Sequence, residues 1–183
     1  MSTAEAMSQA TVPATGAGAT TAAAAAQATT TPSGSSGATH LALMVGEERY
    51  LVDLAEAGEI VPMPSSSILQ VPLTRDWFLG VVNVRGTLFT VVDLTRFMGG
   101  EFTPLSKESR LLTMSPALTF NATLVVSRML GLRNSAAMTA IEEQPAYDKP
   151  WLSERFRDAE GQIWQRLSLS KLVSASAFLM VGR

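Results

Sequence analysis

An arginine interrupts an otherwise apolar stretch near the middle of the sequence, and its side chain is well suited to recognition chemistry. Residues 78–94 read FLGVVNVRGTLFTVVDL, two apolar runs joined by a polar segment that contains Asn83, Arg85 and Gly86. Strand alternation groups Arg85 with Val81 and Asn83 on a row that becomes polar toward Gly86. Two interpretations remain open: an exposed arginine at a hairpin end, or a fixed guanidinium that offers a rigid fork of donors to a partner.

The acidic residues form no pair placed for general acid–base catalysis. Asp93 is best explained as the N-cap of a helix, and Asp53 is expected to point outward from its strand. The other candidates are sequence neighbours in turn-like or loop segments, where adjacent side chains diverge: Glu47 with Glu48, and Glu142 with Glu143. We therefore predict no catalytic residue and a protein that is not an enzyme.

Composition argues against several other kinds of site. The 183 residues include no cysteine and one histidine, His40, so we expect no thiolate nucleophile, no metal site and no bound cofactor. The net charge of −2 gives no electrostatic footprint for nucleic acid or an anionic membrane. Because no stretch approaches the ~20 apolar residues of a membrane span, we expect a cytoplasmic protein without membrane insertion.

The first 39 residues differ sharply from the rest of the chain. They are rich in Ala, Thr, Ser, Gly and Pro, contain no aromatic residue, and carry Glu5 as their only charge. Such a segment cannot bury enough apolar surface to offset ordering costs of roughly 1–2 kcal/mol per residue. We predict a disordered low-complexity tail over 1–39, followed by one domain over 40–183.

The domain reads as a series of short strands separated by turns. Residues 59–64, EIVPMP, predict an edge strand because they contain two prolines. Residues 134–159 are polar and irregular, which predicts a long connection with strand fragments. The remaining strand-like segments are 41–45, 49–54, 109–114 and 121–132.

An internal repeat organises the domain. Residues 86–98, GTLFTVVDLTRFM, and residues 161–173, GQIWQRLSLSKLV, share the same order of residue types. Asp93 and Ser168 hold the position of a helix N-cap, where a side chain accepts hydrogen bonds from first-turn N–H groups. Each copy therefore predicts a turn, a strand, a cap and a short helix. The second helix is expected to be longer, because apolar residues continue at helical spacing: Leu169, Leu172, Val173, Leu179 and Met180.

The repeat predicts two small β subdomains, each closed by a short helix. Many short strands with glycine-rich turns favour a barrel or sandwich over a doubly wound sheet. The three tryptophans fit this scheme in different ways. Trp164 takes the aromatic position of the repeat and is expected in the core, Trp77 is expected to cover one end of a sheet, and Trp151 to act as a lid or surface anchor.

Residues 40–181 resemble the CheW-like domain family of chemotaxis coupling proteins. The family pattern N-x-R-G followed by V-x-D-L matches Asn83, Val84, Arg85 and Gly86, then Val91, Val92, Asp93 and Leu94. The resemblance implies two intertwined five-stranded SH3-like barrels. It also implies an adaptor that bridges the cytoplasmic tip of methyl-accepting receptors to the regulatory domain of a CheA-type histidine kinase. Residues 83–86 would then face a protein partner.

Two segments, WFLGVVNVRG and VVSRMLGLRN, look most like the PilI-type variant that is attached to type IV pilus twitching systems. Ser127 departs from the family, since many members carry an acid there, and the connection 134–159 is unlike the usual one. An alternative from the residues is a small-molecule-binding β-barrel without a signalling role. That function would require an apolar cavity with a few convergent polar groups.

Overall fold

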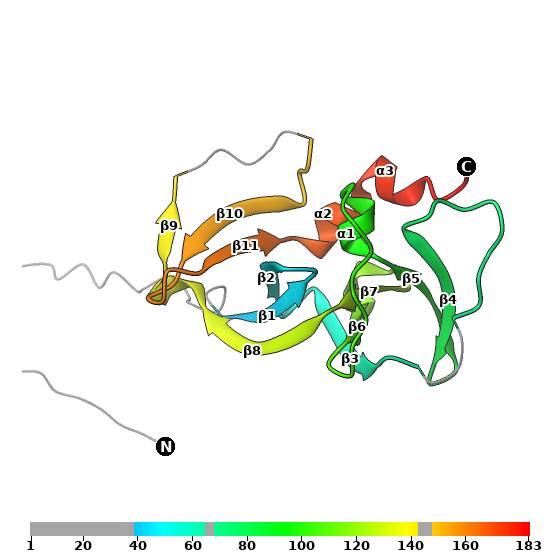
Figure 1. Ribbon diagram of the computed structural model, residues 1–183, viewed down its shortest axis with the longest axis horizontal. Coiled ribbons are helices and arrows are strands. Elements are labelled where there is room, and N and C mark those ends of the chain that lie inside the picture. Colours follow the sequence, from blue (N-terminus) through cyan, green and yellow to red (C-terminus); the bar gives the residue numbers. More distant parts are fainter. Residues whose placement is uncertain (1–38, 65–67, 143–147) are drawn as a thin grey trace, which may run out of the picture. The chain divides into compact units, whose positions relative to one another are not determined.

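The computed structural model describes residues 39–64, 68–142 and 148–183 (Figure 1). The predicted tail therefore lies outside the described residues except for Thr39, which already belongs to the first strand. Over these three ranges, eleven strands and several short helices follow in the order β1 (Thr39–Val45), β2 (Glu48–Asp53), β3 (Ala57–Pro62), β4 (Phe78–Val84), β5 (Thr87–Val92), α1 (Leu94–Phe97), β6 (Arg110–Met114), η2 (Pro116–Leu118), β7 (Ala122–Val126), β8 (Arg128–Asn134), η3 (Ser135–Ala137), β9 (Thr139–Ile141), β10 (Leu152–Arg157), β11 (Ile163–Leu167), α2 (Leu169–Ser174) and α3 (Ser176–Leu179).

The strands of the described ranges form two sheets. The first sheet has the order β8-β1-β2-β11-β10-β9, and the second sheet has the order β3-β6-β7-β5-β4. The predicted mainly β fold with two subdomains is confirmed, and β3 is an edge strand as its prolines indicate. The first sheet has six strands rather than the expected five, because β9, from the connection 134–159, pairs with β10.

The two copies of the repeat take equivalent places in the two sheets. In the second sheet, β5 forms a hairpin with β4 and pairs in parallel with β7. In the first sheet, β11 pairs antiparallel with β10 and in parallel with β2. Each repeated strand then leads directly into a short helix, α1 or α2. The repeat is therefore a unit of hairpin, parallel strand and helix.

The chain passes between the sheets where β7 ends and β8 begins. Ser127 sits at this step, and its N–H donates to the Met44 carbonyl over 2.8 Å. Its hydroxyl oxygen accepts from the Gly46 N–H over 2.9 Å. These two bonds attach the crossing to β1 and to the turn that follows β1. Position 127, where the sequence departs from many members of the family, thus has a structural role.

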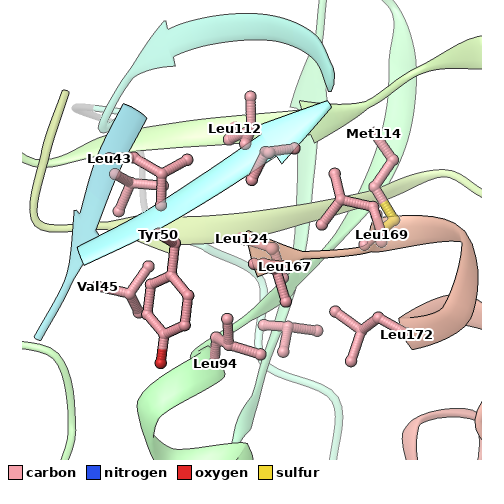
Figure 2. Close-up of a cluster of buried hydrophobic side chains, with 14 of the residues drawn as sticks. Leu43, Val45, Tyr50, Leu94, Leu112, Met114, Leu124, Leu167, Leu169 and Leu172 are labelled. Carbon is pink, nitrogen blue, oxygen red and sulfur yellow. The ribbon is translucent and has the colours of Figure 1, made fainter. Parts of the chain in front are cut away.

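The main core is built by both sheets and by both repeat helices. The first sheet contributes Leu43 and Tyr50, the second contributes Leu124, and α1 and α2 contribute Leu94 and Leu169 (Figure 2). All of these side chains are buried. Because the helices follow their strands at once, each helix places its first residue over the end of its own sheet. The helices therefore close the core, as the repeat predicts.

The tryptophans are more buried than the sequence pattern suggested. Trp164 is a core residue, as predicted. Trp77 is buried and stacks against Phe178 with ring centroids 5.9 Å apart. The prediction for Trp151 as a lid or surface anchor is wrong: it is only 6% exposed and packs on Phe97 of α1. The neighbouring prolines suggested a surface loop, whereas the segment that begins β10 turns its indole inward.

The C-terminal helix predicted from the apolar spacing is interrupted. Helix α2 ends at Ser174, and Ala175 is extended before α3 begins. The break rotates the apolar face, so Phe178 is the buried residue of α3, while Leu179 and Met180 are 49% and 64% exposed. The expectation that the second helix is longer than the first is confirmed, since α2 has six residues and α1 has four. The expectation that it continues through Leu179 and Met180 is wrong.

Candidate functional site

Arg85 lies in the two-residue turn between β4 and β5. Val84 and Thr87 are paired across the hairpin, and the turn residues Arg85 and Gly86 have φ angles of +50° and +88°. Positive φ at both positions is the pattern of a type I′ turn, which matches the twist of the flanking strands. The carboxamide oxygen of Asn83 accepts from the Gly86 N–H over 2.8 Å. Asn83 and Gly86 therefore build the turn, and Arg85 is presented by it.

The structure corrects the strand row that the alternation suggested for Arg85. Strand β4 ends at Val84, and Arg85 leaves the pleat because its backbone is left-handed. A left-handed conformation is uncommon for a residue with a side chain, and such strain clusters at functional sites. The side chain of Arg85 is 80% exposed. It thus projects from the tip of the hairpin rather than from a face of the sheet.

Glu59 of β3 is the partner of Arg85 within the chain. The Nη2 atom of Arg85 lies 2.6 Å from Oε1 of Glu59, and the Glu59 side chain is 39% exposed. An ion pair this exposed contributes about 0–1 kcal/mol to folding. The fold therefore depends little on this ion pair. Sequence reasoning missed Glu59, because only the fold brings β3 beside the hairpin.

A groove opens beside this ion pair, between the two edges of the second sheet. Its volume is about 340 Å³, and Arg85 and Glu59 stand among its lining residues. Apolar side chains supply much of the remaining lining: Ile60, Val61, Pro62, Pro64, Val82, Val84 and Leu111. A hollow lined by both apolar side chains and a charged pair suits a protein segment that carries both apolar and acidic side chains.

The two predicted cap residues occupy N-cap positions. Asp93 is 2% exposed and accepts from the Arg96 N–H over 3.1 Å. Its carboxylate also accepts from the N–H and the hydroxyl of Thr103, over 2.7 and 2.9 Å. Ser168 accepts from the Lys171 N–H over 3.3 Å. Asp93 therefore caps α1 and also holds the loop that follows α1, a second task that the repeat did not reveal.

Glu56, from the segment between β2 and β3, supports the cap of α2. Its carboxylate accepts from the Leu169 N–H over 2.6 Å and from the hydroxyls of Ser168 and Ser170. The Glu56 carbonyl also accepts from the Ser115 N–H over 2.9 Å, next to the end of β6. Glu56 thus connects the helix of one sheet to a strand end of the other.

Among the residues that the structure describes, three groups have pKa values displaced from their usual range. Burial, with a smaller effect from Glu48, raises the pKa of Tyr50 to about 12. A hydrogen bond from the Arg96 guanidinium lowers the pKa of Asp76, and one from the Trp164 indole lowers the pKa of Asp158. Burial or a hydrogen-bond partner therefore explains each of these shifts.

The other acidic candidates are scattered. Asp53 accepts from the Ala55 N–H over 2.8 Å in a tight turn, and Glu47, Glu48 and Glu142 are exposed. Glu143 lies outside the described residues. His40, the single histidine, is buried within β1. Within 39–64, 68–142 and 148–183, no group of three or more His, Asp or Glu residues is placed to hold a metal ion.

A second hollow lies beside α3 and has the largely apolar lining that the alternative function would require. Its volume is about 220 Å³, and its walls are largely aromatic and aliphatic: Trp77, Phe78, Val92, Phe120, Phe178, Leu179 and Val181, with Thr90. This volume is below the roughly 300–1,000 Å³ of typical ligand pockets. The lining also lacks the several convergent polar groups that orient a small molecule.

The fold and the 83–86 turn agree with one family of signalling proteins. The sequence model of the CheW-like domain matches residues 39–177, so the chain belongs to that family. The resemblance that the N-x-R-G and V-x-D-L patterns indicated is therefore confirmed. Within the described part of the chain, no helix is both long enough and apolar enough to cross a membrane.

Two known proteins are similar to this chain in sequence or in fold. Protein PilI of Pseudomonas aeruginosa is 29% identical over 145 residues, which cover 78% of this chain and 79% of PilI. The crystal structure of the scaffolding protein TtCheW from Thermoanaerobacter tengcongensis matches with a TM-score of 0.62 at 20% identity. That match covers 77% of this chain and 95% of TtCheW, and it shows that the two proteins share a fold.

Proposed function

We propose that this protein is a non-enzymatic adaptor that couples methyl-accepting receptors to a CheA-type histidine kinase. Membership of the CheW-like domain family is the observation that carries the proposal. The name of TtCheW as a scaffolding protein supports it. The adaptor would work in the cytoplasm and reach membrane-associated receptor arrays through its partners.

The turn at 83–86 is the proposed partner contact. Asn83 and Gly86 fix the backbone, so the Arg85 side chain starts from a rigid position and loses little backbone entropy on binding. The guanidinium presents several donors in a plane, which suits a carboxylate of a partner. The groove beside it would take the neighbouring side chains of the same partner segment. Val84, an apolar residue, would contact the partner as part of the groove lining.

The two-sheet architecture suits a coupling role. An adaptor must contact two partners at once, and two sheets with separate outer surfaces offer that possibility. The 83–86 turn belongs to the second sheet. We propose that one partner, the receptor tip or the kinase regulatory domain, binds at this turn and that the other uses a different surface.

The pathway is proposed to be the one that controls type IV pili. PilI is the relative that supports this choice over flagellar chemotaxis, and 79% of its length is covered by the match. Deleting the gene in its native host should impair twitching on a surface and leave swimming unchanged. The opposite pattern would assign the protein to flagellar control.

The coupling function can be tested with purified proteins. The full chain should bind a fragment of a receptor signalling tip and, separately, a CheA-type regulatory domain in titrations by fluorescence anisotropy. It should also raise the receptor-dependent autophosphorylation of the kinase in a reconstituted mixture. Binding of neither partner, with a normal melting curve, would contradict the adaptor role. A tight small aromatic ligand in the pocket beside α3 would then favour the binding-barrel alternative.

A further inference from the structure

The four edges of the two sheets differ in how well they are protected. Strand β9 is only three residues long, and β3 ends in Pro62. The outer side of β4 is bridged at Val81, which exchanges two 2.9 Å backbone hydrogen bonds with Leu69. Short strands, prolines and covering segments are the devices that proteins use to prevent strand addition. Three of the edges seen in the described residues are thus blunted.

Strand β8 is protected differently. Its pairing with β1 shifts register once, between the pairs Ala42–Gly131 and Leu43–Met129, and its outer side is otherwise uncovered within the described residues. It has seven residues without proline, and within the described residues it pairs with β1 alone. Figure 1 shows β8 at the margin of its sheet, with β1 on one side. Its exposure pattern leaves Gly131 to Asn134 open to solvent, and Leu132 is 60% exposed. An edge of this length with an exposed leucine is a template for another strand.

The side chains around β8 are mainly basic. Arg128 and Arg110 line one hollow of about 280 Å³ with Met129 and Glu108. Arg128 pairs with Glu108 while both side chains remain more than half exposed. At the other end of β8, the Arg133 guanidinium lies 5.7 Å from the centre of the Trp164 ring. Arg133 also lies near Asp158, whose pKa it helps the Trp164 indole to lower. Arginines thus outnumber acidic residues around β8 by three to two, in a chain whose net charge is −2.

The arginines around β8 indicate which kind of strand could pair with this edge. A second copy of this chain paired through β8 would gather four arginines, Arg128 and Arg133 from each copy, on two adjacent strands. Like charges on neighbouring strands destabilise a pair. A strand with acidic residues would instead meet opposite charges at both ends of β8. Alternate apolar residues of that strand could cover Leu132.

We propose that β8 is a docking edge for an extended acidic segment of a partner protein, which would join the first sheet as an additional strand. Backbone hydrogen bonds would supply much of the affinity. Arg128 and Arg133 would select acidic sequences, and Leu132 would favour an apolar residue between them. This edge belongs to the first sheet, whereas the 83–86 turn belongs to the second. The inference therefore does not depend on the proposed contact at Arg85.

The test uses the full chain and a synthetic nine-residue peptide that alternates Glu and Val and carries a fluorophore. We expect binding that weakens with added salt and that slows amide hydrogen exchange in β8. The same peptide with Lys in place of Glu should not bind. A peptide with every amide N-methylated should also fail, because it cannot donate to a strand edge.

Variants of the chain sharpen this experiment. Arg128→Gln should weaken binding of the acidic peptide at least tenfold. Arg75 is also exposed but lies outside β8, so Arg75→Gln should leave the affinity for the peptide unchanged. Arg85→Asn should also leave it unchanged, which separates this edge from the turn. Absence of binding, equal binding of the Lys peptide or the N-methylated peptide, or binding without protection of β8 amides would each overturn the proposal.

Discussion

The two copies of the repeat share a plan but use their turns differently. Both begin with a glycine of positive φ, Gly86 or Gly161. In the first copy the residue before that glycine, Arg85, projects outward with 80% of its side chain exposed. In the second copy the turn is pinned from within, because Asp158 accepts from the Gln162 N–H and from the Trp164 indole, each over 2.7 Å.

The two copies also differ in how many side chains cap their helices. The first copy uses a single buried carboxylate, Asp93, for α1 and for Thr103 of the following loop. The second copy shares the task between Ser168 and Glu56, so two side chains serve the start of α2. The first copy thus depends on one residue for its helix while its turn carries a charge that folding does not need. A charge that folding does not need is available for recognition.

Asp93→Ala should have the largest effect on stability. The substitution removes a cap and leaves the buried N–H of Thr103 without its acceptor, while the Thr103 hydroxyl keeps its 3.2 Å bond to the Thr95 hydroxyl. These losses should lower the free energy of unfolding by about 2–4 kcal/mol. Urea denaturation of this variant and of Thr103→Val would separate the contribution of the Thr103 contact from that of the helix cap. A loss below about 0.5 kcal/mol would show that the carboxylate is not needed.

Ser168→Ala should have a smaller effect, about 0.5–1 kcal/mol, because Glu56 still accepts from the Leu169 N–H. The double variant with Glu56→Ala should lose more than the sum of the single losses if the two side chains back each other up. Chemical denaturation of the four proteins measures this coupling. If the losses of unfolding free energy were strictly additive, Ser168 and Glu56 would not back each other up as caps of α2.

Asp158→Asn tests whether the hydrogen bond between Asp158 and Trp164 makes the stability of the protein depend on pH. Because the Trp164 hydrogen bond holds the pKa of Asp158 below its usual range, the stabilisation is present above the unfolded-state pKa near 3.9 and is lost as pH falls through the folded-state pKa. The melting temperatures of the wild type and the variant should differ at pH 7 and converge in acid. A constant difference over pH 2.5–7 would refute the proposed linkage.

Deletion of residues 1–38 should have the smallest effect, a change of no more than a few degrees in the melting temperature. Their composition predicts that they add little to the core. The cut is placed before Thr39 because this residue pairs with Asn134 in the first sheet. A large loss on scanning calorimetry, compared with the full chain, would show that the segment is an ordered part of the fold.

Sequence reasoning succeeded where chemistry is local and failed where it depends on distant packing. Strands, turns and caps follow from nearby residue types, so the repeat and Asp93 could be placed before the fold was known. Glu59 and Glu56 could not, because they lie 26 and 112 positions from Arg85 and Ser168. Trp151 was misjudged for the same reason: flanking prolines describe the backbone, not the core that receives the indole.

The partner-binding role of Arg85 is tested most directly by Arg85→Asn. Asparagine tolerates a left-handed turn, so stability should change by no more than about 1 kcal/mol, the range of an exposed ion pair. Arg85→Lys and Arg157→Asn serve as the charge-retaining and remote controls. Titrations against the receptor tip and the kinase regulatory domain should show at least ~30-fold weaker binding of one partner by Arg85→Asn, in line with a hot-spot loss of about 2 kcal/mol. Unchanged affinity for both partners with a normal melting curve would contradict the account.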